Sequence, residues 1–388
     1  MKRKHEQKRT PHASSGARRG KFGASILGPR NLSLEAENRD KLAPPPTDAG
    51  TMPNLKWSFA DSHMRLEEGG WARQVTVREL SIAKELAAVN MRLEAGAIRE
   101  LHWHKESEWA YMLKGRARIT AVDQSYRTFA DDVVEGDLWF FPAGIPHSIQ
   151  GLEKDGCEFL LVFDDGSFDE NKTFLLSDVI SHMPKEVLAK NFGVSASAFA
   201  KIPEKELYIF QSQVPGPLTA DRLAGAGPVP QWFSYRMPTQ QPIRTKSGSI
   251  RIVDSKIFGA SKTIAAALVE IQPGGMRELH WHGNGDELQY YLSGQGRMTV
   301  FNADANAATI DFQAGDVGYV PCFMPHYVEN TGITTLRFLE LFRSDHFEDI
   351  SLAQWLALTP HELVRAHLNI SESVLAKIPR RDTPIVPD

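Results

Sequence analysis

The sequence predicts a mainly β protein with two domains in one chain, each a β-sandwich or small barrel followed by a short helical segment. Three observations lead to this prediction. The chain repeats itself, the repeated blocks consist of short strand-like segments, and a helical stretch follows each block. A chain of 388 residues also exceeds what one hydrophobic core usually supports, so two domains are expected.

The internal repeat is the strongest feature of the sequence. Residues 91–104 read MRLEAGAIRELHWH and residues 269–282 read VEIQPGGMRELHWH, which is an offset of 178. Farther along, Pro146 and His147 match Pro325 and His326 at an offset of 179, so one residue is inserted in the loop after the second HxH. The repeat predicts two domains of the same fold.

The strand-like segments are short and rich in aromatic and β-branched residues, and Gly, Asp and Pro separate them. This pattern is typical of a sandwich or small barrel and argues against a parallel sheet alternating with helices. The clearest such segments are 116–122, 138–141, 159–163, 297–301 and 336–342.

The rest of the chain divides around these blocks. Helical patterns occupy 184–202 and 350–378, and a Pro run with little periodicity marks the start of the chain. We therefore expect an extended basic N-terminal arm over 1–55, a first domain over 56–202, a Pro- and Gly-rich linker over 203–240, and a second domain with a C-terminal helical segment over 241–388.

Composition narrows the class of protein. Apolar residues make up 42% and charged residues 24%, which is the balance of a soluble protein, and no apolar run is long enough for a membrane helix. Two cysteines cannot make a disulfide framework. Residues 1–30 hold nine Lys or Arg against one acid, but Arg18 and Arg19 precede too short an apolar stretch for an export signal. We expect a cytoplasmic protein that binds neither nucleic acid nor membrane.

Six of the thirteen histidines fall in two matched sets with a glutamate. On a strand the two histidines of each HxH project from the same face. Three imidazoles and one carboxylate suit manganese, iron, nickel or zinc and leave an octahedral ion two open positions. The alternative, that these are ordinary core histidines, is poorly compatible with a duplicated set. The predicted metal ligands are His102, His104, Glu108 and His147 in the first copy, and His280, His282, Glu287 and His326 in the second.

Both copies resemble the cupin motif, in which five residues separate a Gly from an HxH, and a Glu and a second Gly follow. The first copy matches at Gly96, His102, His104, Glu108 and Gly115, and the second at Gly274, His280, His282, Glu287 and Gly294. In the second block of the motif, Gly151 replaces an Asn and Phe323 replaces a Gly. The resemblance implies a bicupin, which is two jelly-roll sandwiches in one chain.

Among bicupins the sequence resembles the bacterial oxalate decarboxylases from about residue 26 to the end. The stretches that carry this resemblance are RELHWHKESEWAY, EGDLWFFPAGIPHS, FDDGSFDEN and AGDVGYVP. The resemblance implies two manganese ions per chain, with dioxygen required but not consumed, and oxalate split into formate and carbon dioxide. It also implies a homo-oligomer, either a trimer or a hexamer.

The loop over 165–173, DGSFDENKT, resembles the mobile lid of this family, and Glu170 stands at the position of its proton-donating glutamate. The family lid reads Ser-Glu-Asn-Ser, whereas this chain has Asp169 and Lys172 on either side of Glu170 and Asn171. A lid acid can protonate the carbon that loses carbon dioxide, and lid closure excludes water. A polar surface loop without function is the alternative that the residues alone favour.

The repeat also exposes a difference between the two sites, since Leu161 aligns with Glu340 at an offset of 179. Glu340 is the fallback catalytic acid, or else a buried partner of Arg337 or Arg343. Arg99 and Arg277 can hold oxalate by charge-assisted hydrogen bonds. Because Arg99 lies three residues before His102, its side chain points inward only if a bulge interrupts the strand over 96–100.

Three other functions remain open. An oxalate oxidase would use the same metal and substrate but release hydrogen peroxide. A non-catalytic storage or sugar-binding bicupin would not need complete ligand sets, and a bicupin dioxygenase would act on a larger aromatic substrate. We interpret Cys157 and Cys322 as reduced packing residues, and Trp139 and Trp281 as wall or core.

Overall fold

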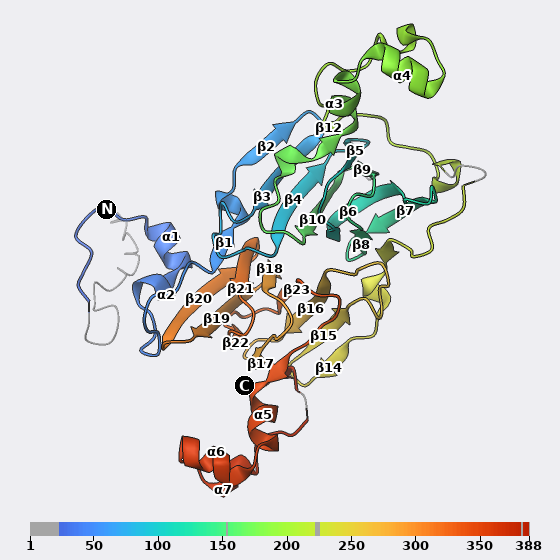
Figure 1. Cartoon of the computed structure of the whole chain (residues 1–388). Helices are drawn as coiled ribbons and strands as arrows, with labels where there is room; N and C mark the ends of the chain where they lie inside the picture. The colour runs from blue at the N-terminus through green and yellow to red at the C-terminus, as the bar shows by residue number, and fades with distance from the viewer. Residues whose placement is uncertain (1–22, 153, 222–225, 382, 388) are drawn as a thin grey trace, which may run out of the picture.

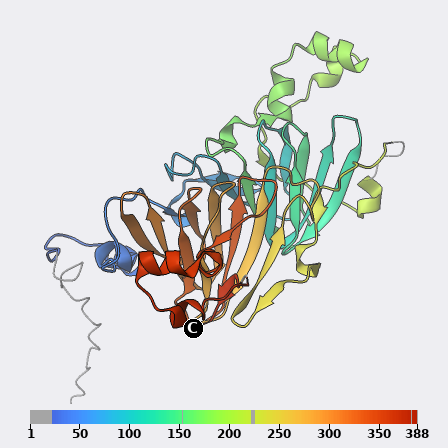
Figure 2. The same ribbon diagram turned by 60° about the horizontal axis from the view of Figure 1, so that its bottom comes forward.

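The computed structural model describes residues 23–388 except 153, 222–225, 382 and 388. The basic residues 1–22 therefore lie outside the described part of the chain. Two antiparallel β domains pack against each other, and a group of helices projects from each (Figures 1 and 2). The mainly β fold with two similar domains confirms the prediction from the repeat.

The first domain contains the strands β2 to β11. Its sheet bends because the long strand β6 pairs with β10 and β8 through its first half and with β7 and β9 through its second half. The bounds are β2 Met64–Glu67, β3 Gly70–Val75, β4 Ala87–Leu93, β5 Ile98–Trp103, β6 Glu108–Val122, β7 Thr128–Val134, β8 Leu138–Phe141, β9 His147–Gly151, β10 Cys157–Phe163 and β11 Phe174–Leu175.

The second domain repeats this arrangement with β14 to β25, and here the long strand is divided into β18 and β19. The bounds are β14 Ile243–Thr245, β15 Gly248–Val253, β16 Ala265–Ile271, β17 Met276–Trp281, β18 Glu287–Ser293, β19 Gln295–Asn302, β20 Asn306–Gln313, β21 Asp316–Val320, β22 His326–Asn330, β23 Leu336–Phe342, β24 Ile350–Ser351 and β25 Ile385–Val386.

Glycine makes the bend in both domains. Gly115 and Gly294 have φ of 77° and 85°, which is left-handed backbone. A Cβ atom at Gly115 would lie 2.3 Å from the carbonyl oxygen of Gly156. The bend therefore accepts only glycine, and it lets one strand line both faces of the sandwich.

The two domains exchange strands with each other. The strand β1 (Lys56–Ser58) precedes the first domain but pairs with β21 of the second. In return, β13 (Ser234–Tyr235), from the segment expected to be a linker, pairs with β8 of the first domain. The other strand of that segment, β12 (Ile209–Phe210), pairs with β5 and so reaches the strand that carries the first HxH.

Helices follow the strands of each domain. The first group is α3 and α4, and the second is α5 to α7, close to the stretches expected to be helical. The bounds of the helices are α1 Leu32–Glu37, α2 Arg39–Leu42, α3 Leu176–Ser181, α4 Lys185–Phe192, α5 Leu352–Leu358, α6 His361–Leu368 and α7 Glu372–Leu375. The 3-10 turns are η1 Phe59–Asp61, η2 Glu170–Lys172, η3 Ala196–Phe199, η4 Leu218–Asp221 and η5 Met237–Thr239.

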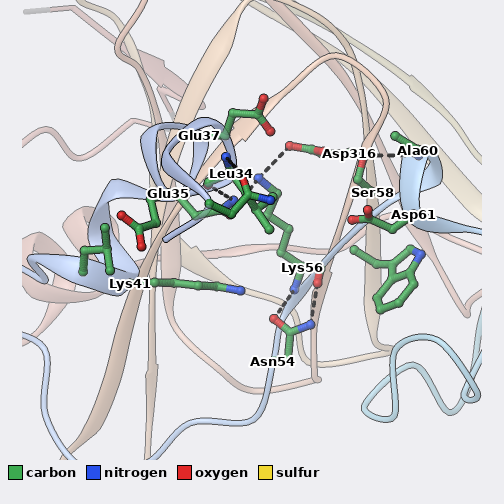
Figure 3. A pocket seen from close by; sticks show the side chains of 14 residues that line it. Leu34, Glu35, Glu37, Lys41, Asn54, Lys56, Ser58, Ala60, Asp61 and Asp316 are labelled. Carbon is green, nitrogen blue, oxygen red and sulfur yellow. Dashed lines mark hydrogen bonds and ion pairs between the residues drawn. The ribbon is translucent and has the colours of Figure 1, made fainter. Parts of the chain in front are cut away.

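The prediction of an extended arm is wrong where α1 and α2 interrupt it, because α2 packs beside β20 and α1 packs beside α2. The Nζ of Lys56 lies 2.8 Å from Asp316 and donates to the Asp311 carbonyl and to Asn38 of the arm. Beside it lies a pocket of about 410 Å³, toward which Lys41 extends (Figure 3). Burial, and to a lesser degree Lys56, lowers the pKa of Lys41.

The core lies inside each sandwich and continues between the two domains. Trp109, Trp139, Phe141 and Phe159 in the first domain are completely or almost completely buried, as are Tyr291 and Phe338 in the second. Each such side chain stabilises the fold by about 1.5–3 kcal/mol. This rigid packing fixes the strands whose ends carry the candidate ligands.

Candidate metal centres

Each half of the chain brings its four predicted ligands together. His102, His104, Glu108 and His147 form the first centre, and His280, His282, Glu287 and His326 form the second. Within each centre one ligand atom from every residue lies within 4.8 Å of the others, and all eight side chains are buried. The structure thus places each duplicated set at one point, as the sequence predicts.

Strand register explains this arrangement. His102 on β5 lies directly opposite His147 on β9. Glu108 begins β6, where it lies opposite Phe141 of β8, and its carboxylate is 3.4 Å from the Nε2 atoms of His104 and His147. In the second domain His280 lies opposite His326 in the same way. The alternation of a strand turns the intervening Trp103 to the other face, where it stacks on Phe174 with ring centroids 5.4 Å apart.

Every histidine in the two centres is oriented by its backbone contact. The Nδ1 atoms of His102, His104 and His147 lie 2.7–2.8 Å from the carbonyl oxygens of Glu100, Glu106 and Ile145. An Nδ1–H that donates to a carbonyl leaves the Nε2 lone pair free, which is the usual arrangement of a metal-binding histidine. The Nδ1 atoms of the second centre contact the carbonyl oxygens of Glu278, Glu348 and Met324.

The buried polar atoms of both centres fit a cation. The Nε2 atoms of His104, His147 and His326 have no hydrogen-bond partner, and the Nε2 atoms of His280 and His282 face each other at 3.1 Å. Two lone pairs at that distance repel unless a metal ion or a proton lies between them, and a metal ion can bind both nitrogens at once. Burial lowers the pKa of His102 and His280, and nearby Arg99 and Arg277 lower it further, so these rings are neutral and ready to bind a metal.

The carboxylate ligands are held by different partners in the two halves. Glu108 accepts a hydrogen bond of 3.0 Å from the indole of Trp139, whereas Glu287 accepts one of 2.9 Å from Gln289. Gln289 in turn accepts a hydrogen bond from Tyr291. Gly318 stands where the first half has Trp139, and this leaves room for the amide. The sequence holds one signal for Gln289: the large Trp139 of the first copy is replaced by Gly318 in the second, so another side chain must fill that space.

Arg99 reaches the lid loop, residues 165–173. A register shift between Arg99 and His102 interrupts the pairing of β5 with β9, near the bulge expected over 96–100, and the second half has the same shift. The Nη2 of Arg99 donates to Glu170 at 2.8 Å and to Thr173 at 3.1 Å. Its Nη1 is buried without a hydrogen-bond partner.

Tyr208 is a site residue that the sequence did not reveal. Its hydroxyl donates to Glu170 at 2.9 Å, and its ring lies between the guanidinium groups of Arg65 and Arg99, 3.6 and 4.3 Å from the centroid. Its φ of 51° is unusual for a tyrosine, and Glu100 holds it there by accepting from its backbone N–H. Tyr208 lies in a segment without repeat or motif, so no pattern pointed to it.

The lid is fastened by further contacts. Asp169 caps the η2 turn and pairs with Arg78, and Asn171 accepts from Arg65. Glu170 is consequently buried within the closed loop. The departures from Ser-Glu-Asn-Ser thus add an ion pair between Asp169 and Arg78 in the middle of the lid, and the exposed Lys172 lies 3.6 Å from the same carboxylate.

Glu340 is completely buried and pairs with Arg277, at 3.2 Å, rather than with Arg337 or Arg343. Burial raises the pKa of Glu340 to about 7, against the opposing charge of Arg277. Arg277 also contacts Asp349, a residue absent from the predicted site. The two arginines that the repeat equates therefore have different surroundings.

Comparison with known proteins agrees with this geometry. The profile of the cupin family matches residues 59–198 and 235–375. The chain is 56% identical to oxalate decarboxylase OxdC of Bacillus subtilis (strain 168) over 95% of its own length and 96% of that protein. The chain belongs to the oxalate decarboxylase family of bicupins.

Other members of the oxalate decarboxylase family match over nearly the whole chain. A probable oxalate decarboxylase of Arthroderma benhamiae is 41% identical, with 94% of this chain and 91% of that protein covered. A solved structure of the B. subtilis enzyme from work on its Mn(II) centres superposes with a TM-score of 0.94 at 55% identity, over 97% of this chain and all of that one. Among the described residues no helix is long and apolar enough to span a membrane.

Proposed function

We propose that this chain decarboxylates oxalate to formate and carbon dioxide at the first centre, with Glu170 as the proton donor. The observation that carries this proposal is the contact between Arg99 and Glu170 beside the three histidines and Glu108. The name and the 56% identity of the B. subtilis relative supply the substrate class.

Arg99 is suited to bind the substrate. It is buried, and its unpartnered Nη1 is a donor that a carboxylate oxygen would satisfy. A buried guanidinium with a free nitrogen favours a small anion over a large aromatic ring. This chemistry supports oxalate over the aromatic substrate of a bicupin dioxygenase.

The atoms of the reaction balance if the protein donates one proton and then recovers one. Hydrogen oxalate yields one formate and one carbon dioxide, so the carbon–carbon bond breaks and a carbon–hydrogen bond forms. Glu170 gives its proton to the carbon that has lost carbon dioxide and regains one from the substrate. Arg99 and Tyr208 hold the Oε1 of Glu170, and this keeps the carboxyl group directed into the site. The closed lid excludes water while the proton moves.

The donor set fits manganese in both halves. Imidazole nitrogen and carboxylate oxygen with open positions suit a divalent redox metal, and the relative whose Mn(II) centres were studied is 55% identical. When bound, manganese together with dioxygen would supply the one-electron chemistry that activates oxalate. The four residues of each centre would hold the ion, and Trp139 and Gln289 would orient the two glutamates.

We also propose a cytoplasmic protein that assembles as a trimer or hexamer. Both cysteines are free, as expected for a reducing compartment. The projecting helices expose Val187 and Phe192 in the first group, and Leu363 and Leu368 in the second. Apolar side chains at equivalent positions of both groups fit burial between neighbouring copies.

The test uses purified protein with manganese, oxalate and air, and measures formate and hydrogen peroxide in the same sample. We expect nearly all consumed oxalate to appear as formate. Peroxide in proportion to oxalate would instead support an oxidase, and no consumption of oxalate at full manganese content would support a non-catalytic bicupin. Either result would overturn the proposal.

A further inference from the structure

Glu100, on the strand that carries the first HxH, is a buried carboxylate that accepts hydrogen bonds from three backbone N–H groups. Its Oε1 accepts from Ser177 at 2.5 Å, and its Oε2 accepts from Leu207 at 3.1 Å and from Tyr208 at 2.9 Å. Charge-assisted bonds of this kind stabilise a carboxylate inside a protein. The side chain therefore connects β5 to two segments that follow the lid, the start of α3 and the residues before β12.

The main chain of Glu100 makes two further contacts. Its N–H donates to the carbonyl oxygen of Tyr208 at 2.9 Å, and its own carbonyl oxygen lies 2.7 Å from the Nδ1 of His102. Glu100 thus bonds to both the N–H and the carbonyl of Tyr208, whose hydroxyl donates to Glu170. One residue therefore lies between a predicted metal ligand and the tyrosine that contacts the lid acid.

Tyr208 needs such support because its φ of 51° is in the left-handed region, where a residue other than glycine is strained. The N–H groups of Leu207 and Tyr208 converge on the Oε2 of Glu100, as successive backbone N–H groups do around a bound anion. Without this carboxylate we expect the backbone to relax toward a negative φ, which would move the phenol away from Glu170.

The second half of the chain has a glutamate at the same position but no tyrosine beside it. The strand β25 pairs with β17 in the register in which β12 pairs with β5, so Pro384 stands where the first half has Tyr208. The carbonyl of Pro384 accepts from the N–H of Glu278 at 3.1 Å, but proline has no N–H to donate in return. The carboxylate of Glu278 accepts from the hydroxyl of Ser351 at 2.6 Å. The bond between this carboxylate and a tyrosine backbone therefore belongs to the half that has the lid glutamate.

We propose that Glu100 is a positioning residue for the proton donor. Its carboxylate holds Tyr208 in the left-handed conformation, and the hydroxyl of Tyr208 in turn directs Glu170 into the site. The proposal rests on the proposed function for the role of Glu170. Glu100 acts through Tyr208 rather than on the substrate, and its main chain sets the orientation of His102 at the same time.

The experiment uses Glu100→Gln in the full-length protein loaded with manganese. The amide keeps the size of the side chain but turns an NH2 group toward N–H donors. Without oxalate, we expect hydrogen–deuterium exchange of the lid peptide 166–173 to become about fivefold faster or more. With oxalate, kcat for formate should fall by about fivefold or more, and peroxide should form a larger share of the products, at unchanged manganese content.

Asp137→Asn is the matched control, because Asp137 is also a buried carboxylate that accepts a backbone N–H, that of Val134, at 2.9 Å. This variant should leave both the exchange of the lid and the ratio of formate to peroxide unchanged. An equal shift of that ratio in Asp137→Asn and Glu100→Gln would mean that the loss of any such carboxylate disturbs the site, and would overturn the inference.

A combined variant tests whether Glu100 acts through Tyr208. In Tyr208→Phe the hydroxyl is already absent, so adding Glu100→Gln should lower kcat by less than about twofold more. Effects that multiply in the combined variant would overturn the inference, as would wild-type lid exchange in Glu100→Gln. If Glu100→Gln does not fold, Glu100→Asp, which keeps the charge but shortens the side chain, takes its place in each measurement. Because the exchange measurement needs no turnover, a lack of formate from the unmodified protein would overturn the proposed function alone.

Discussion

The guanidinium of Arg99 and the carboxylate of Glu170 lie 2.8 Å apart, although the two residues come from the HxH strand and from the lid. This contact joins the metal centre to a loop that is three residues longer than its counterpart in the second half.

Tyr208→Phe removes the hydroxyl that donates to Glu170 but keeps the ring between Arg65 and Arg99. A single hydrogen bond of this type contributes about 0.5–1.5 kcal/mol, so we expect kcat for formate to fall by roughly 2–13-fold, with a smaller change in KM. Steady-state kinetics of both parameters measure this. Tyr126→Phe, at an exposed hairpin, is the control. An unchanged kcat for Tyr208→Phe would show that its hydroxyl does not position Glu170.

Gln289→Met removes the amide that orients Glu287 in the second centre. Loss of such an outer partner usually lowers metal affinity by about 10–100-fold. After dialysis against a chelator, we expect manganese to fall from two ions per chain toward one, while Gln295→Met, on the exposed start of β19, stays at two. Retention of both ions by Gln289→Met would contradict the role given to this residue.

Asp40→Asn should stabilise the protein most at high pH. Burial, followed by a hydrogen bond with Asp311, raises the pKa of Asp40 to about 6, against the attraction of Arg297. Because folding favours the protonated form, its stabilising contribution is complete below about pH 4 and is lost as pH rises through about 6. We expect the variant to gain roughly 1 kcal/mol at pH 8 and little at pH 4.5.

Calorimetric melting at the two pH values measures this difference. Glu37→Gln, an exposed acid on the same arm, should shift the melting temperature equally little at both. A larger gain for Asp40→Asn at pH 4.5 than at pH 8 would reverse the expected sign.

Replacing manganese with zinc separates metal binding from catalysis. The three-histidine, one-glutamate set should accept zinc, but zinc cannot undergo a one-electron step. We therefore expect a zinc-loaded protein to keep its melting temperature and to produce less than about 1% of the formate of the manganese form. Full activity with zinc would rule out the radical route.

The metal ligands could be predicted from the sequence because the same set of residues occurs in both copies of the repeat. The spacing of His102, His104, Glu108 and His147 recurs in the second half, and a strand that alternates its faces brings such residues together. The predicted strand segments 138–141 and 336–342 match β8 and β23. Runs of aromatic and β-branched residues between turn residues favour a strand over a helix.

The remaining site residues depend on tertiary contacts that no local pattern records. Tyr208 lies in the segment expected to be a linker and reaches Glu170 because β12 pairs with β5. Asp349 could not be predicted from the repeat, because the loop after β23 is three residues shorter than the loop after β10. The offset between the two copies therefore changes from 179 to 176 just before this residue. The partner of Glu340 proved to be Arg277, which is distant in sequence, rather than the nearby Arg337 or Arg343.

The most direct test of the account is the ratio of formate to hydrogen peroxide produced by Glu170→Gln at full manganese content. The amide keeps the size of the side chain but carries no acidic proton, so we expect formate to fall by about 100-fold or more and some peroxide to appear. Asp169→Asn, which keeps Glu170, should still produce mainly formate. Unchanged formate production by Glu170→Gln, without peroxide, would contradict the assignment of Glu170 as the proton donor.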